Sequence, residues 1–397
     1  MAQRPRRHNM LAVCLPGLEE LLVAELRALG VKNARKDSKG AVTARVSSRE
    51  LYAANVFLRS ATRVYVDAFS FRADTFSLLE RRLRDVDWAP WLDAERSRMS
   101  LRVSSHSSAL FHTGAIEERF RRFLPPSLRS FLPEPLEQRV LVRVERDVVT
   151  VKIDASGEPL HERGWRQQTA KMPLRESVAA AVLQRSGWDP TTPLIDPCCG
   201  AGTLAIEAAL RAIGAPPHAP DRAFALQAWP QFEAGTWASV QAQAEEQARA
   251  ARQAAERPRS PLTIVASDRD AGAVAAATAN AQRAGVAELI SFRQAPLSEL
   301  APQQQAAGPP GTVVSNLPWG LRSAAAGGAS TDLRNLYASL GRACRAKLPG
   351  WGLALLVADR AMARHVSPAL RSELSLEVGG VRAWLMTRAS WRANTRT

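Results

Sequence analysis

The chain has 397 residues and a formal net charge of +15, from 53 Lys and Arg against 38 Asp and Glu. This length exceeds the usual size of one domain, so we expect at least two domains, each large enough to bury its own core. The basic residues are spread along the whole chain, which suits a polyanionic partner such as nucleic acid. An arginine-rich composition without such a partner would give the same excess, so charge alone leaves both interpretations open.

Cysteine usage and hydropathy exclude several protein classes. The four cysteines, Cys14, Cys198, Cys199 and Cys344, form no C-x-x-C pair, so neither a disulfide framework nor a metal site is expected. No run of about 18 apolar residues occurs, and the basic start is not followed by a long apolar stretch. We therefore expect a cytoplasmic protein without a membrane span. The sequence does not predict the oligomeric state.

The first 155 residues combine short strands with amphipathic helices. Residues 11–30 predict a strand, a Pro-Gly break and a helix with leucines along one side. A second helix is expected from Ser48, which would be its N-cap. Alternating half-buried strands are expected at 63–71, 99–106 and 139–154. The pattern predicts an α+β module over residues 1–155.

A connector and a second domain follow this module. Residues 156–172 lose hydrophobic periodicity and gather polar and basic side chains, which is typical of a linker. Beyond it, short apolar strands alternate with helices of about a dozen residues, a pattern of βαβ units and a parallel sheet. We therefore expect residues 173–397 to form one α/β domain with a doubly wound, Rossmann-like sheet.

The strongest local motif follows the first strand of the second domain. That strand ends at Asp196, a turn beginning with Pro197 contains Gly200 and Gly202, and a helix begins near Thr203. A ligand can lie against the backbone of such a turn at the helix N-terminus. The turn lacks the third glycine of the dinucleotide fingerprint, so an ordinary strand-to-helix turn is the alternative.

A second acidic residue, Asp268, closes the next strand of this domain. A carboxylate at that position can accept hydrogen bonds from ribose hydroxyls, although an acid there is more often a helix cap. Asp270 competes for the capping role. The separation from Asp196 is far longer than the roughly 20 residues of a compact unit, so an insertion is expected.

The third motif, Asn316-Leu317-Pro318-Trp319, stands at another strand end. A base stacked on Trp319 would direct its amino group at two acceptors, the Asn316 amide oxygen and the Leu317 carbonyl. These acceptors would aim the nitrogen lone pair at an electrophilic carbon. A simple Pro-aromatic turn is the alternative.

With these motifs in order, the chain resembles the THUMP-domain RNA methyltransferases, which form N2-methylguanosine in bacterial 23S rRNA and in tRNA. The resemblance covers nearly the whole chain and rests on residues 14–30, 58–66, 87–92, 160–166, 173–183, 196–209 and 315–320. It implies a ferredoxin-like piece and a THUMP domain that bind RNA, followed by a Rossmann-like methyltransferase domain. The implied cofactor is S-adenosylmethionine, and the implied partner is tRNA or 23S rRNA, with the choice left open.

The resemblance also implies roles for individual residues. Cofactor contacts fall on the turn, at Asp196, Pro197, Gly200, Gly202 and Thr203, and on Asp268. The catalytic residues are Asn316, Leu317, Pro318 and Trp319, which hold the base. In the connector, Arg163 and Arg166 are the candidate RNA contacts.

One position departs from the family pattern. Pro296 stands where related enzymes usually place an acid that reads the adenine amino group, so Ser298 or Glu299 would have to substitute for it. Two other functions are kept as alternatives. An adenine-N6 nucleic-acid methyltransferase would use a similar Asn-Leu-Pro-Trp motif, and a catalytically inactive RNA-binding module is the second alternative.

Overall fold

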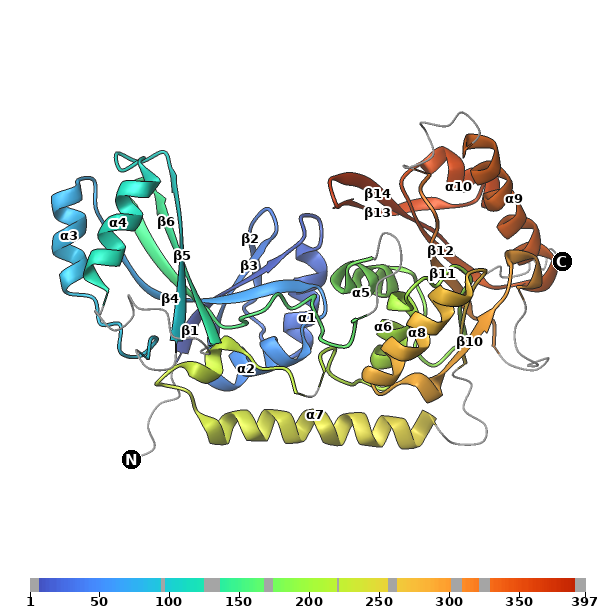
Figure 1. Cartoon of the computed structure of the whole chain (residues 1–397), viewed down its shortest axis with the longest axis horizontal. Helices are drawn as coiled ribbons and strands as arrows, with labels where there is room; N and C mark the ends of the chain where they lie inside the picture. Colours follow the sequence, from blue (N-terminus) through green and yellow to red (C-terminus); the bar gives the residue numbers. More distant parts are fainter. Residues whose placement is uncertain are drawn as a thin grey trace. The chain divides into compact units, whose positions relative to one another are not determined.

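A computed structural model of the chain describes residues 7–93, 97–124, 136–167, 174–219, 221–255, 263–300, 309–320 and 329–389 (Figure 1). The contacts divide the chain into two compact units. The first unit consists of the chain up to Cys14, Leu22–Leu160 and Asp221–Gln241. The second consists of Leu15–Leu21, His161–Pro220 and the chain from Ala242 onward.

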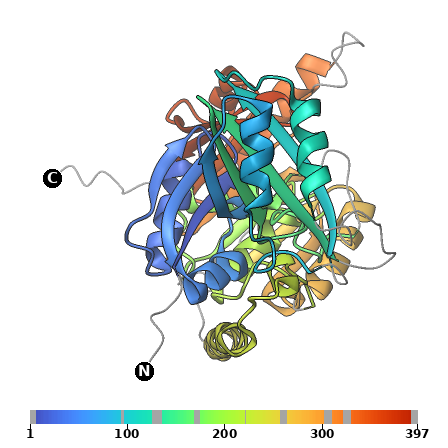
Figure 2. The same ribbon diagram turned by 90° about the vertical axis from the view of Figure 1, so that its left-hand side faces the viewer.

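The first unit is built on a seven-stranded sheet in the order β2-β3-β1-β4-β7-β6-β5. Its strands are β1 (Arg7–Cys14), β2 (Arg35–Ser38), β3 (Ala41–Ser47), β4 (Ala61–Arg72), β5 (Ser97–His106), β6 (Leu136–Glu145) and β7 (Val148–Asp154). Its helices include α1 (Glu19–Ala28), α2 (Ser48–Phe57), α3 (Phe76–Arg84) and α4 (Thr113–Phe123). Figure 2 shows α3 and α4 in front of the strands, on one face of the sheet. Among the described strands of this unit, only β5 and β6 pair in parallel.

The start of α2 corrects one expectation. Ser47, not Ser48, is the N-cap, because its side chain accepts a hydrogen bond from the Glu50 N–H at 3.3 Å. The Glu50 carboxylate in turn accepts from the Ser47 N–H at 2.7 Å. The two bonds form a capping box, so the serine that begins the box fixes the helix start.

A segment from the second half of the sequence packs in the first unit. The Trp229 indole donates to the Gln138 side chain at 2.9 Å, and the Glu233 N–H donates to the Tyr52 hydroxyl at 3.0 Å. The long helix α7 (Ala234–Ala255) follows. The expected domain over 173–397 therefore loses Asp221–Gln241 to the first unit. The sequence of this segment gives no sign of which unit it packs in.

The second unit contains a seven-stranded sheet in the order β10-β9-β8-β11-β12-β14-β13. Its strands are β8 (Leu194–Asp196), β9 (Ile264–Asp268), β10 (Ile290–Gln294), β11 (Thr312–Asn316), β12 (Gly352–Val357), β13 (Arg371–Val378) and β14 (Val381–Arg388). Its main helices are α5 (Glu176–Arg185), α6 (Thr203–Ala212), α8 (Ala271–Arg283), α9 (Ala329–Lys347) and α10 (Arg360–Val366). The strands from β10 to β12 pair in parallel, and β14 is antiparallel to β12.

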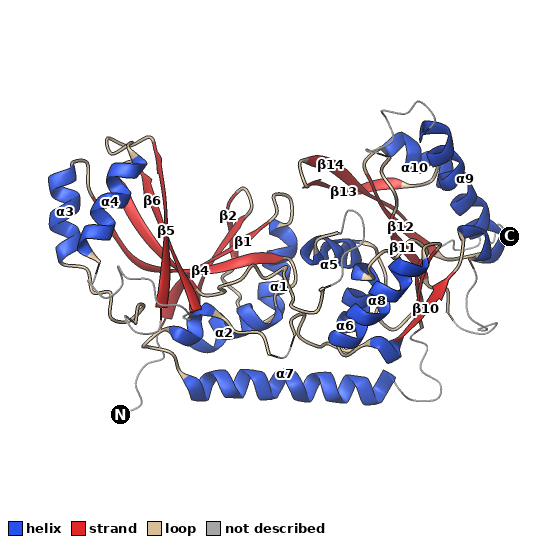
Figure 3. Ribbon diagram, viewed as in Figure 1, coloured by secondary structure: helices blue, strands red, loops and turns tan. Residues whose placement is uncertain are grey.

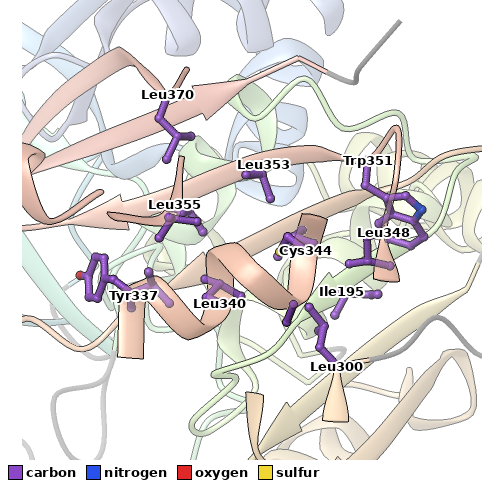
Figure 4. Close-up of a cluster of buried hydrophobic side chains, with 14 of the residues drawn as sticks. Ile195, Leu300, Tyr337, Leu340, Cys344, Leu348, Trp351, Leu353, Leu355 and Leu370 are labelled. Carbon is purple, nitrogen blue, oxygen red and sulfur yellow. The ribbon is translucent and has the colours of Figure 1, made fainter. Parts of the chain in front are cut away.

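Helices lie on both faces of this sheet, with α6 and α8 on one side and α9 and α10 on the other (Figure 3). The side of α9 that faces the strands buries Tyr337, Leu340 and Cys344 against Ile195 and Leu355 (Figure 4). From β8 the chain continues to β9 and β10 on one side of the sheet, and then crosses to β11 on the other side of β8. The strand order therefore reverses between β8 and β11. Open α/β sheets bind ligands at the carboxyl ends of strands beside such a switch point. Within the described residues, no helix combines the length and apolar character needed to cross a membrane.

Candidate active site

Three of the residues singled out in the sequence end three neighbouring parallel strands. Asp196 ends β8, Asp268 ends β9 and Asn316 ends β11. In the sheet, β8 lies between β9 and β11. The three side chains therefore come from one edge of the sheet, at the switch point, although they are far apart in the sequence.

The turn after β8 requires glycine. Gly200 and Gly202 have φ angles of +51° and +83°, in the left-handed region that side chains disfavour. A Cβ on Gly202 would stand 2.9 Å from the Cβ of Ala277 on α8. The turn thus lies directly against α8, and α6 begins at Thr203 immediately after it. The first N–H groups of that helix and its dipole favour an anionic or polar ligand group.

Asp196 is almost completely buried, with 1% of its surface exposed. Its Oδ1 accepts hydrogen bonds from the Ser315 hydroxyl at 2.8 Å and from the Cys198 N–H at 3.3 Å. Burial raises the pKa of this carboxyl to about 7, the two hydrogen bonds lower the pKa and the nearby charge of Asp268 raises it further. A buried carboxylate with a raised pKa is suited to a ligand that brings a positive charge.

Asp268 is committed to the turn and not to capping α8. Its Oδ2 accepts from the Gly200 N–H and its Oδ1 from the Asp270 N–H, each at 3.1 Å. Asp270 caps α8, because its Oδ1 accepts from the Gly272 N–H at 2.8 Å. The competition between the two acids is therefore resolved in favour of Asp270 as the cap. Asp268, which is partly exposed, is left beside the glycine turn.

The Asn316-Leu317-Pro318-Trp319 segment leaves β11 with two polar groups facing no protein partner. Among the described residues, the Asn316 Oδ1 and the Trp319 Nε1 are buried atoms without a hydrogen-bond partner. The backbone is held on both sides of Leu317, whose N–H donates to the Leu356 carbonyl at 3.3 Å. The buried Tyr337 hydroxyl donates to the Pro318 carbonyl at 3.2 Å. An unpaired acceptor on a fixed backbone is what a substrate amino group requires.

The position that departs from the family pattern offers no carboxylate. Pro296 is exposed and precedes the short helix η4 (Leu297–Glu299). The adjoining Ala295 N–H donates to the Asp268 carbonyl at 3.0 Å, which joins this loop to the end of β9. The side chains of Ser298 and Glu299 are exposed, and the Ser298 carbonyl accepts from Lys347 at 2.7 Å.

The structure contradicts the expected role of one of the two connector arginines, Arg163. Arg163 has no exposed surface, and its Nε donates to the Glu207 Oε1 at 3.1 Å inside the second unit. Arg166 pairs with Glu176 at 2.9 Å and donates to the Leu174 carbonyl at 2.9 Å. Arg163 therefore cannot reach an RNA phosphate, whereas Arg166 is partly exposed and stays a candidate RNA contact. Polarity and charge in the sequence do not reveal this burial.

Comparison with known proteins decides the class of this site. The model of a family described as RMKL-like, methyltransferase domain, matches residues 163–379, more than half of the chain. The chain belongs to this methyltransferase family. A model described as RlmL ferredoxin-like domain matches residues 9–65. The expected fold class, a ferredoxin-like domain followed by a Rossmann-like methyltransferase domain, is confirmed.

Several solved structures share this architecture over almost their whole length. A putative methyltransferase, SMU.472, complexed with SAH is 25% identical, with a TM-score of 0.81, over 98% of this chain and 100% of that one. A predicted N6-adenine-specific DNA methylase from Listeria monocytogenes is 26% identical, with a TM-score of 0.79, over 96% of each chain. TrmN from Thermus thermophilus is 22% identical, with a TM-score of 0.68, over 97% and 100%, and this likeness concerns the fold.

The methyltransferase uses S-adenosylmethionine, and the residues at the strand ends fit this cofactor. The glycine turn leaves a cradle that a Cβ would fill, and Asp196 supplies a buried carboxylate. Ser315, which donates a hydrogen bond to Asp196, was not singled out from the sequence. Its only sequence signal is its place directly before Asn316, at the end of β11. Tyr337 gave no such signal, because it is one aromatic residue on a helix face.

If Asp196 contacts the ammonium group of the cofactor, its raised pKa predicts a cofactor affinity that depends on pH. Only the ionised carboxylate attracts the ammonium group of S-adenosylhomocysteine, so affinity should rise with pH through about 7 and then level off. One pH unit below that midpoint, binding should be roughly tenfold weaker. Calorimetry between pH 5.5 and 8.5 measures this dependence. 5′-Methylthioadenosine, which has no ammonium group, is the control, and an equal slope for both ligands would exclude Asp196 as the cause.

Proposed function

We propose that this methyltransferase transfers the methyl group of S-adenosylmethionine to N2 of guanine in RNA, with tRNA or 23S rRNA as the substrate. The observation that carries the proposal is the unpaired Asn316 Oδ1, which stands at the end of β11, next in the sheet to the strand that ends in Asp196. An exocyclic amino group has two N–H bonds to donate, and Asn316 and the Leu317 carbonyl are two acceptors on adjacent residues.

Methyl transfer at this site depends more on how the substrate amino group is oriented than on a strong general acid or base. The cofactor supplies an electrophilic methyl group on a sulfonium. Guanine N2 is a weak nucleophile because its lone pair is delocalised into the ring. Asn316 and Leu317 would hold both N–H bonds and so direct the lone pair, and the face of Trp319 would stack on the base. Tyr337 and Leu356 fix the backbone that carries these groups.

We favour guanine in RNA over adenine in DNA as the substrate because of the first unit. Its RlmL-type ferredoxin-like domain belongs to the architecture that the sequence resemblance associates with RNA. We further propose that residues 1–155, with Asp221–Gln241 in the same unit, act as the RNA-binding module with a THUMP domain. The linker expected at 156–172 would join this module to the methyltransferase domain at 173–397, and its described residues from His161 to Gln167 already belong to the second unit. Adenine N6 is the second candidate, because the similar Listeria structure is described as a predicted N6-adenine-specific DNA methylase.

The choice of nucleic acid is tested directly with the purified chain and S-adenosylmethionine labelled in the methyl group. Deproteinised total RNA and sheared genomic DNA, from cells that lack this gene, are offered separately as substrates. We expect label in the RNA and none above background in the DNA. Label in DNA alone would support the adenine alternative.

RNA binding should depend strongly on salt. The chain carries a net charge of +15, and each phosphate that it neutralises releases counterions. We expect the RNA affinity of the full chain to fall at least roughly tenfold between about 50 and 200 mM salt. Fluorescence anisotropy with a labelled tRNA measures it, and duplex DNA of equal length should bind more weakly. Equal affinity for the two polymers, or an affinity independent of salt, would contradict an RNA-binding module.

A further inference from the structure

The connector motif at residues 160–166 is not used by the proposed function, yet part of it is deeply embedded in the second unit. The Trp165 side chain is buried, with 1% of the residue exposed, and its indole donates to the Pro217 carbonyl at 3.2 Å. The neighbouring Arg163 is paired with Glu207 on α6. The backbone of the motif is therefore fixed within the second unit, and with it the Trp165 carbonyl.

A chain of hydrogen bonds leads from this motif to the cofactor turn. The Arg283 Nε, at the end of α8, donates to the Trp165 carbonyl at 2.9 Å. The Arg283 Nη2 donates to the Asn280 Oδ1 one turn earlier on the same helix. The Asn280 Nδ2 donates to the Ala201 carbonyl at 3.0 Å. Ala201 lies between Gly200 and Gly202, so the last bond holds the middle of the turn.

The geometry also fixes which way the Asn280 amide points. A guanidinium has only donors, so the amide must present its oxygen to Arg283 and its NH2 group to the Ala201 carbonyl. Asn280 is completely buried, so water cannot replace either contact without a cost. Ala277, one turn before Asn280, is the residue that a Cβ on Gly202 would meet first. One face of α8 thus sets both the position and the orientation of the turn.

We propose that Asn280 is a positioning residue for cofactor binding, and that Arg283 and the Trp165 carbonyl orient it. The connector motif acts on the cofactor site from within the second unit. This role depends on the cofactor and not on which nucleic acid is methylated. Of the cofactor's parts, the amino acid end lies nearest the turn if its ammonium group meets Asp196, so the effect should concern that end.

The test is the isosteric substitution Asn280→Asp, which replaces the donor facing the Ala201 carbonyl by an acceptor. Calorimetry should show S-adenosylhomocysteine binding about tenfold more weakly, as for the loss of one hydrogen bond and the repulsion that replaces it. 5′-Methylthioadenosine, which lacks the amino acid end, should bind within about twofold of the parent affinity. A merely structural role for Asn280 would weaken both ligands together.

The chain offers a matched control. Asn55 is also completely buried, and its side chain donates to the Leu51 carbonyl at 3.0 Å and accepts from the Ser156 hydroxyl at 2.8 Å, all within the first unit. Asn55→Asp introduces the same buried change and should leave affinity for both ligands unchanged. A second variant, Arg283→Met, frees the Asn280 amide to flip and should weaken S-adenosylhomocysteine about threefold.

The melting temperature of each variant shows whether it is folded. If Asn280→Asp does not fold, Arg283→Met decides the question by the same comparison of two ligands. Unchanged S-adenosylhomocysteine affinity in a folded Asn280→Asp protein would overturn the proposal. Equal losses for the two ligands, or the same selective loss in Asn55→Asp, would overturn it as well.

Discussion

Asn316→Ala is expected to lower the rate of methyl transfer at least about a hundredfold, while cofactor affinity stays within about twofold of the parent value. The Asn316 Oδ1 is buried and has no partner among the described residues, so the substitution removes an acceptor that the protein itself does not use. Without it, the amino group loses one of the two contacts that aim its lone pair at the methyl carbon. Single-turnover rates at saturating cofactor and RNA measure this step apart from binding.

Substitutions at Trp319 separate alignment from capture of the base. Trp319→Ala should weaken binding of the substrate RNA by about 1 to 3 kcal/mol, the usual contribution of one stacked base. Trp319→Phe keeps a flat face and should retain part of that affinity. If Asn316→Ala reacts at the parent rate, this segment is a structural turn and the reacting base is held elsewhere.

Asp196→Ala is expected to lower cofactor affinity roughly tenfold to a hundredfold, for a lost charge-assisted hydrogen bond, and so to lower activity strongly at cofactor concentrations that just saturate the parent enzyme. Asp196→Asn should lower it nearly as far, because the amide fits the same space without the charge. Calorimetry with S-adenosylhomocysteine at pH 8 measures both variants, since the parent carboxylate is mostly ionised there.

Asp196→Asn should lower cofactor affinity without lowering the stability of the fold at pH 8. Since burial raises the pKa of folded Asp196 to about 7, well above the value of about 4 in the unfolded chain, the carboxyl stabilises the fold most at low pH. That contribution is lost as pH rises through about 7. At pH 8 the neutral Asp196→Asn protein should melt at or above the parent temperature in the absence of ligand. Parent cofactor affinity in both variants would refute the role of Asp196, whatever their stability.

The place of the candidate site in the fold was predictable from the sequence, because its residues follow the strands. Each of Asp196, Asp268 and Asn316 comes directly after a short apolar run, and in a parallel sheet the carboxyl ends of such strands meet at one edge. Positive φ angles explain the glycines of the turn in the same local terms. These signals need only neighbouring residues, so the sequence contains them in full.

The features that escaped the sequence all depend on long-range packing. The sequence alone suggests a solvated cation at Arg163, but its buried ion-pair partner, Glu207, lies 44 residues further along the chain. Asn280 sits in an alanine-rich helix, and its function is visible only once the turn at Ala201 lies against it. Likewise, nothing in Asp221–Gln241 predicts that it packs with strands of the first unit. Local patterns specify elements, and partners far apart in the sequence are determined by the fold.

The central claim, methylation of guanine N2 in RNA, is tested most directly by identifying the methylated nucleoside. The purified chain is incubated with total RNA from cells that lack this gene and with S-adenosylmethionine carrying a heavy-isotope methyl group. After digestion to nucleosides, mass spectrometry locates the heavy label. We predict label in N2-methylguanosine that is lost with Asn316→Ala. Heavy label in N6-methyladenosine, or in no nucleoside of the RNA, would contradict the claim.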